Sequence, residues 1–168
     1  DIGKILCGIT RPHFFEGVAQ AVYRLLEIVE PEIAVFGQKD YQQLFIIKKM
    51  VMDMSLGVQI LSHSTVRESD GLAMSTRNNY LSSKERAIAP ELFRILERAR
   101  EGYLSSKTVE SLRVDIHKSI NQHFELEYAE IIDANNLKQI TDNTNEIAIL
   151  CAVSLGPNRL IDNIFFWR

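Results

Sequence analysis

The sequence predicts an α/β protein, with the C-terminal half of a doubly wound parallel sheet followed by a smaller α+β unit that contains an antiparallel sheet. Short apolar runs first alternate with helical patterns, and strand, helix and strand joined by short connections imply parallel strands. Later, three β-like runs are separated by Asn- and Gly-containing turns, which favour antiparallel pairing. The polar stretch 62–69 lies between these parts, and we therefore expect domains at residues 1–63 and 64–168.

The elements of the first domain follow from hydrophobic periodicity. Apolar residues at helical spacing predict a helix that ends before Pro31, and a second helical pattern lies between two short apolar runs typical of buried strands. Half of a sheet would leave an open edge, and the chain begins at Asp1 without an initiator Met, so we expect an upstream portion to be absent. The predicted elements are helix 15–29, strand 33–36, helix 40–55 and strand 58–61.

Two helices and three strands are predicted for the second domain. Ser82 and Glu85 form a capping box, which opens one continuous helix ending near Gly102. Thr108 caps a further helix that reaches about residue 124. Strands are expected at 126–134, 146–155 and 159–166, with a short turn at 156–158 joining the last two.

Composition excludes several classes of protein. With 168 residues, 46% hydrophobic and 24% charged, the chain has ordinary globular composition and enough apolar residues for one core or two small ones. The formal charge of -3 and the lack of a basic run argue against nucleic-acid binding, and no stretch reads as a membrane span or signal peptide. Cys7 and Cys151 lie in apolar runs, which indicates buried thiols in a reducing, cytoplasmic compartment.

The strand-to-helix corner at residues 36–43 is the first candidate binding site. Open α/β sheets bind ligands at the carboxyl ends of their strands, where a new helix offers N–H groups to an anion. Gly37 would let a ligand approach the backbone, Lys39 adds a positive charge, and Asp40 and Gln43 suit a hydroxyl or amide partner. The pattern fits a nucleotide, although Gly followed by Lys and Asp also makes an ordinary helix start.

A second candidate is the loop Met74–Asn78, within a stretch rich in small and amide residues. Ser75 and Thr76 bring adjacent hydroxyls and Arg77 a planar guanidinium, a combination that suits a polyphosphate. An ordinary surface loop is the alternative interpretation. Arg11, at a turn-like connection, is a third candidate for the same cleft or else an isolated surface charge.

The remaining ionisable residues give weaker signals. His13 could lie near the corner, whereas the other histidines lack the spacing of a metal centre, so no metal ligand is predicted. Asp133 and Asp162 fall in the predicted antiparallel sheet, and we interpret both as turn residues. The other histidines are His63, His117 and His123.

Two stretches resemble the pantoate:β-alanine ligase (pantothenate synthetase) family. They read Phe-Gly-Gln-Lys-Asp-Tyr-Gln-Gln-Leu at residues 36–44 and Asp-Gly-Leu-Ala-Met-Ser-Thr-Arg-Asn at residues 70–78, with Tyr80 and Leu81 following. The resemblance extends over essentially the whole chain. It implies a Rossmann-like domain of the nucleotidylyltransferase type, followed by a smaller lid domain, and a homodimer for the complete protein.

The resemblance also implies a reaction in coenzyme A precursor biosynthesis. With ATP and Mg2+, family members adenylate the carboxylate of pantoate, release pyrophosphate, and let the amine of β-alanine displace AMP. Such an enzyme must align the carboxylate with the α-phosphate, neutralise charge on the phosphates, and keep water from the acyl-adenylate. The expected partners are therefore ATP, pantoate and β-alanine.

By the same resemblance, the corner belongs to the ATP site. Gly37, Gln38, Lys39 and Asp40 are expected to bind the nucleotide, with Lys39 on phosphate and Asp40 on ribose. Gln43 is expected to contact pantoate.

The loop is implied to have a nucleotide role as well. Residues Met74–Arg77 would be equivalent to the Lys-Met-Ser-Lys-Ser signature of class I tRNA synthetases, and Val66 would touch the adenine. Arg11 matches an arginine of the active-site cleft. The expected catalytic residues are Lys39, Ser75, Arg77 and Arg11.

The chain departs from the family pattern in two ways. Between Arg-Pro and Gly-Val, the family usually carries a small residue followed by His-Phe-Arg, whereas here His13 is displaced by one position and Glu16 stands where a base is usual, so neither takes a role. The His-x-Gly-His motif and a Gln that holds pantoate and β-alanine belong to the N-terminal half and are absent. We therefore expect these 168 residues alone to bind ATP weakly and to form no pantothenate.

Two other functions stay open at this point. The chain could belong to a nucleotidyltransferase that adenylates another carboxylate, or it could be a non-catalytic assembly module that has kept the lid fold. A purely structural module has no physical reason to collect the polar residues of the two candidate sites, which speaks against this alternative. These residues are Lys39, Asp40, Ser75 and Arg77.

Overall fold

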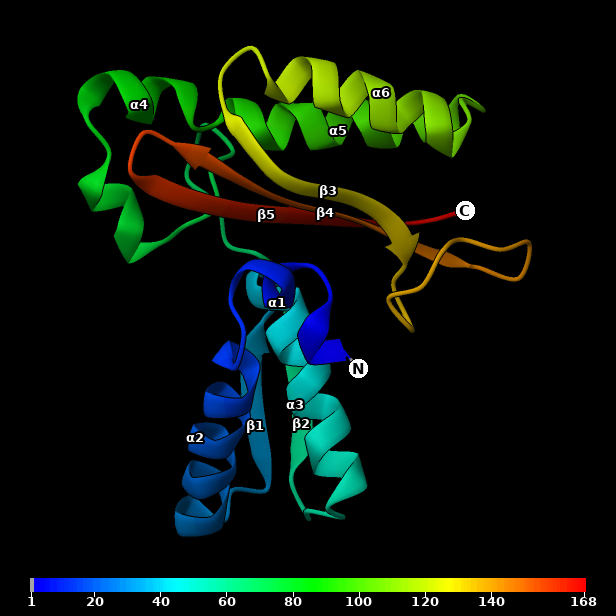
Figure 1. Ribbon diagram of the computed structural model, residues 1–168. Coiled ribbons are helices and arrows are strands. Elements are labelled where there is room, and N and C mark those ends of the chain that lie inside the picture. Colours follow the sequence, from blue (N-terminus) through cyan, green and yellow to red (C-terminus); the bar gives the residue numbers. More distant parts are fainter. Residues whose placement is uncertain (1) are drawn as a thin grey trace. The chain divides into compact units, whose positions relative to one another are not determined.

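The computed structural model describes residues 2–168 as two compact units, which divide between Thr65 and Val66 (Figure 1). Asp1, the first residue of the predicted domain 1–63, lies outside the described residues. One sheet has two strands and the other has three. The predicted α/β class, with a partial parallel sheet and a separate antiparallel sheet, is confirmed.

The first unit contains a two-stranded parallel sheet and its connecting helix. Strand β1 (Ile33–Gly37) pairs in parallel with β2 (Gln59–His63), and α3 (Tyr41–Asp53) joins them, as the strand–helix–strand pattern predicted. Helix α2 (Phe14–Val29) precedes β1 and packs beside α3. The shorter elements of this unit are η1 (Ile2–Lys4), α1 (Cys7–Thr10) and η2 (Gln38–Asp40), of which the sequence predicted none.

Apolar side chains of the first unit remain accessible on both helix and sheet. Leu25 and Val29 of α2 are 60% and 65% exposed, and Ile33 and Val35 of β1 are 51% and 62% exposed. Strands of parallel sheets are usually covered on both faces. The described residues of this unit therefore leave part of its apolar surface uncovered.

The second unit is built on a three-stranded antiparallel sheet in the order β3–β4–β5. The central strand β4 (Glu146–Leu155) is buried along most of its length, between β3 (Glu125–Asp133) and β5 (Asn158–Trp167). A two-residue turn at Gly156 and Pro157 joins β4 to β5, with Gly156 at φ +57°, a value that favours glycine. The three predicted strands are thus confirmed within one residue at each end.

Helices α5 (Glu91–Leu104) and α6 (Val109–Ile120) cover one face of this sheet (Figure 1). Their apolar faces and the buried side chains of β4 form one hydrophobic core. The capping box at the start of α4 (Ser83–Ile88) is confirmed, since Ser82 N–H donates to Glu85 and Glu85 N–H donates to Ser82 Oγ.

The prediction of one continuous helix from Ser82 to Gly102 is wrong. Helix α4 ends at Ile88, and α5 begins at Glu91 with Pro90 as its N-terminal flanking residue. Proline has no N–H to donate to the preceding turn, so the helix breaks there and restarts. The break lies against the core, since Ala89 is fully buried.

Candidate functional site

Gly37 ends β1 and opens the predicted corner. Its backbone is extended, at φ −74° and ψ 137°, which any residue can adopt. A Cβ atom built on Gly37 would meet no atom within 4 Å among the described residues. Neither backbone conformation nor packing in the first unit therefore requires glycine here, and the bare backbone is open to the close approach of a ligand.

Lys39 and Asp40 lie in the short helix η2 between the strand and α3. Asp40 is the N-cap residue of α3, yet its side chain makes no capping hydrogen bond, and it is exposed. A carboxylate at this position would ordinarily accept an N–H from the first turn. An ordinary helix start would usually have this capping hydrogen bond. Its absence here speaks against the alternative that the stretch only begins a helix.

Gln42, a residue that sequence reasoning missed, is buried and ties the opening segment to the corner. Its Oε1 accepts the Cys7 N–H at 3.1 Å, and its Nε2 donates to the carbonyls of Ile2 and Ile5 at 2.8 Å and 2.7 Å. These contacts hold α1 beside the first turn of α3. Gln43, the predicted pantoate contact, is half-buried at the next position.

Arg11 follows α1 directly and is half-buried. Its guanidinium carbon lies 3.5 Å from the centroid of the Phe14 ring, a cation–π geometry. Arg11 thus follows α1, the helix that Gln42 holds beside the first turn of α3. His13 Nδ1 and Glu16 Oε2 lie 3.0 Å apart and form an exposed hydrogen bond.

In the second unit, the predicted loop is a short 3-10 helix, η3 (Thr76–Tyr80). Ser75 is its N-cap and accepts the Arg77 N–H through Oγ at 3.3 Å, while its hydroxyl keeps a hydrogen to donate. Thr76 and Arg77 are exposed. The hydroxyls and the guanidinium are therefore gathered on one turn, as the sequence predicted.

Two exposed apolar side chains adjoin this turn. Met74 donates its N–H to the Val66 carbonyl at 2.9 Å, and the two residues are 50% and 53% exposed. Exposed apolar side chains of this kind can contact the face of a heteroaromatic base. The structure thus brings Val66 next to the loop, eight positions earlier in the sequence.

Behind the loop, Arg67 and Asp162 form a largely buried ion pair that sequence reasoning missed. Arg67 donates from Nη1 and Nη2 to the two oxygens of Asp162 at 2.7 Å and 2.9 Å. The prediction that Asp162 serves a turn is wrong, because it lies in the middle of β5. The available signal was the alternation of β5, in which Leu160, Asp162 and Ile164 all face inward.

Asp133 does serve a turn, as predicted. It ends β3, accepts the Asn135 N–H through Oδ1 at 2.8 Å, and accepts the Thr144 hydroxyl through Oδ2 at 2.8 Å. The carboxylate therefore holds together the two ends of the connection between β3 and β4.

Local charges and burial shift the pKa values of two ionisable groups in the second unit. Arg86 donates to Asp70, which lowers the pKa of that carboxyl below its ordinary value. Burial in β4 raises the pKa of the Cys151 thiol, and the nearby Asp162 carboxylate raises it further. Cys7 and Cys151 are both buried free thiols, as predicted.

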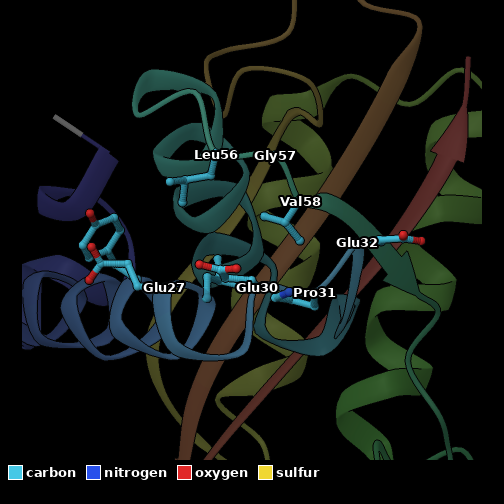
Figure 2. Close-up of a pocket in the computed structure, with 9 residues that line it drawn as sticks. Glu27, Glu30, Pro31, Glu32, Leu56, Gly57 and Val58 are labelled. Atoms are coloured by element: carbon cyan, nitrogen blue, oxygen red, sulfur yellow. The ribbon is translucent and has the colours of Figure 1, made fainter.

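A pocket of about 450 Å³ lies at the amino ends of β1 and β2. Figure 2 shows Leu56 and Val58 on one side and Glu30 and Pro31 on the other, with the Glu32 carboxylate directed away. None of the predicted site residues lines this pocket. It lies at the opposite strand ends from Gly37, so it is not the predicted nucleotide site.

Within residues 2–168, no three His, Cys, Asp or Glu side chains are grouped so that they could hold a metal ion. No helix in that range combines the length and apolar character needed to cross a bilayer.

Sequence comparison gives a family match over nearly the whole chain. The model of the family described as pantoate-beta-alanine ligase matches residues 1–165. A pantothenate synthetase of Vesicomyosocius okutanii is 55% identical over 167 residues, covering 99% of this chain and 59% of the relative. A pantothenate synthetase of Ruthia magnifica is 56% identical over 165 residues, covering 98% of this chain and 59% of the relative.

Solved structures agree with the sequence comparison. The crystal structure of pantothenate synthetase from Thermus thermophilus has a TM-score of 0.92 and 36% identity, covering 97% of this chain and 60% of that chain. The pantoate-beta-alanine ligase of Francisella tularensis, complexed with beta-gamma ATP and beta-alanine, has a TM-score of 0.73 and 31% identity, covering 97% and 54%. The chain therefore spans about three fifths of the length of these relatives.

Proposed function

The chain belongs to the pantoate-beta-alanine ligase family, and from this membership we propose that the complete protein condenses pantoate with β-alanine in an ATP-dependent reaction. The observation that carries the proposal for this chain is the corner after β1. There Gly37 leaves the backbone open and the Asp40 carboxylate is not used as a helix cap. ATP and β-alanine are the ligands of the Francisella tularensis relative, which supports the same ligands here.

We assign nucleotide roles to both units. In the first unit, Lys39 would bind phosphate, Asp40 a ribose hydroxyl, and Gly37 and Gln38 the backbone side of the nucleotide, while Arg11 and Gln43 would approach the reacting pantoate carboxylate. An ammonium and a carboxylate at one strand-to-helix corner suit the anionic and the hydroxyl parts of ATP respectively.

In the second unit, Ser75, Thr76 and Arg77 would bind the triphosphate, and Val66 and Met74 would contact the adenine. The grouping of hydroxyls and guanidinium on η3 supports this assignment, as does the exposed apolar pair beside it.

The chemistry asks for positioning and electrostatics. Pantoate attack on the α-phosphate forms a pantoyl-adenylate and releases pyrophosphate, and amine attack on that carbonyl releases AMP. The cations Lys39, Arg77 and Arg11 would stabilise the phosphate charge that develops, and Ser75 would orient an oxygen by hydrogen bonding. Mg2+ would enter with ATP and supply further charge neutralisation on the phosphates.

Calorimetric titration with ATP tests the site in this chain. We expect weak binding by the 168-residue chain and about tenfold weaker binding by Lys39→Ala, because a cation bound to phosphate is lost. Lys48→Ala, which removes a lysine from α3, is the matched control and should bind like the unchanged chain. Equal affinities for all three proteins would favour the assembly-module alternative.

A second experiment tests substrate and completeness. We would join the chain to the N-terminal portion of the Vesicomyosocius okutanii relative and measure ATP–pyrophosphate exchange with pantoate and with other hydroxy acids. We expect the joined protein to catalyse exchange with pantoate. The 168-residue chain alone should catalyse no exchange. Preference for another hydroxy acid would favour the nucleotidyltransferase alternative, and turnover by the chain alone would show the expected inactivity to be wrong.

A further inference from the structure

We propose that Arg67 is a positioning residue which, held by Asp162, fixes the base of the Met74–Arg77 loop and so presents Ser75 and Arg77 to the nucleotide. The loop base consists of residues 66–74. The inference rests on the proposed function for the nucleotide, but its structural part, the fixing of the loop, stands on contacts within the second unit alone.

The guanidinium of Arg67 contacts groups on three segments. Besides its two bonds to Asp162, it donates from Nη2 to the Asn163 carbonyl and from Nη1 to the Gly71 carbonyl, each at 3.1 Å. Its carbon lies 3.7 Å from the centroid of the Phe93 ring of α5. Arg67 thus links the loop base to β5 and to α5.

The ion pair is shielded from solvent. The side chains of Arg67 and Asp162 are 18% and 3% exposed. Ionic hydrogen bonds at low exposure are strong and directional, and a bidentate arginine–carboxylate pair also fixes orientation. Arg67 is therefore suited to hold backbone in one place rather than to add charge at the surface.

The loop base consists of two short antiparallel segments, which the Arg67–Asp162 ion pair holds together. Arg67 and Ala73 form an antiparallel bridge, Met74 N–H donates to the Val66 carbonyl, and Glu68 N–H donates to the Leu72 carbonyl. Leu72 and Ala73 are buried. The backbone that leads into Met74 is consequently held by pairing on one side and by burial on the other.

Gly71, at the tip of the loop base, packs closely against a side chain of α5. Its φ of +95° favours glycine, and a Cβ there would approach the Phe93 ring to 2.8 Å. Phe93 therefore contacts both the tip and the Arg67 guanidinium. The loop base fits one arrangement against α5 and β5, which is what preorganised binding groups need.

Amide hydrogen exchange of the 168-residue chain tests the fixing. The main variant is Arg67→Met with Asp162→Leu, because replacing both charges by apolar groups avoids leaving one buried charge unpaired. We expect amides of residues 68–78 to exchange about tenfold faster or more, since methionine cannot donate to the Gly71 carbonyl. Arg67→Lys keeps the charge without the planar fork and should give a smaller acceleration.

The chain offers a matched control in Arg159 and Glu127. This pair is also bidentate, at 2.6 Å and 2.9 Å, and is 20% and 16% exposed, but its two residues lie on β5 and β3 and neither belongs to the loop base. Arg159→Met with Glu127→Leu should leave exchange at residues 68–78 unchanged. Equal loop exchange in the two double variants would overturn the proposal, and if the Arg67 double variant does not fold, unchanged loop exchange in Arg67→Lys would do so.

ATP titration of the same proteins connects the loop base to the nucleotide. If the two double variants have equal melting temperatures, the Arg67 double variant should bind ATP about tenfold more weakly than the Arg159 double variant. The reason is that the binding groups of its loop are no longer held in place. If the unchanged chain shows no ATP binding, the proposed nucleotide site fails, while the exchange comparison still decides whether Arg67 fixes the loop. ATP binding that stays equal despite faster loop exchange would overturn the role of Arg67 in presenting Ser75 and Arg77.

Discussion

Gln42 accepts the backbone N–H of Cys7 at 3.1 Å, and this bond joins α1 to α3 across 35 positions of sequence. The same carboxamide donates to the carbonyls of Ile2 and Ile5. Three backbone groups of the opening segment are thus satisfied by one buried side chain. Because Arg11 follows α1 directly, Gln42 also fixes where a candidate catalytic residue lies.

Gln42→Leu is expected to destabilise the first unit by about 2 kcal/mol, because it removes three hydrogen bonds made by a buried side chain. The change should appear in urea unfolding followed by circular dichroism, together with faster amide exchange at Cys7. Gln43→Leu is the neighbouring control, and its effect on stability should stay within about 0.5 kcal/mol. Equal losses in both variants would contradict the role assigned to Gln42.

Ile149→Ala is expected to destabilise the second unit by about 2–5 kcal/mol, because it opens a cavity in the core. Ile149 is fully buried in β4. Val114→Ala, at a position 61% exposed on α6, should change stability by less than about 0.5 kcal/mol. Fluorescence of Trp167, the single tryptophan, reports unfolding of this unit because it lies in β5.

Asp70 should make the second unit less stable in acid. Its pKa is lowered by Arg86, so the stability from this ion pair is present above the ordinary value of 3.8 and is lost as pH falls through the lower folded-state pKa. Asp70→Asn should therefore be less stable than the unchanged chain at neutral pH, and the difference should disappear at an acid pH below the folded-state pKa of Asp70. Urea unfolding at both pH values measures this, with Asp142→Asn, an exposed turn position, as the control.

Cys151 is expected to resist thiol reagents in the folded protein. Burial and the Asp162 carboxylate raise its pKa, so the folded state keeps the neutral thiol, and the associated stability is lost as pH rises above the ordinary thiol value of about 8.5. In a Cys7→Ala background, labelling at pH 8 should be slow until denaturant is added. Fast labelling under native conditions would show that β4 opens readily.

Patterns of neighbouring residues predicted most elements and the composition of the candidate site. The capping box at Ser82, the two-residue turn before β5 and the hydroxyls beside Arg77 are set by residues a few positions apart, so they could be predicted without coordinates. The break at Pro90 was available to the same reasoning. Its missing N–H is a local property that the continuous apolar periodicity concealed.

The sequence by itself determined the two kinds of sheet, the strand-to-helix corner with Lys39 and the loop with Arg77, because these depend on local preference and hydrophobic period. Only the tertiary structure decided that Asp162 belongs to Arg67 rather than to a turn, and that Gln42 holds the opening segment. These partners lie 95 and 35 positions apart, and the cost of burying a charge or an amide is offset only once the fold has brought them together.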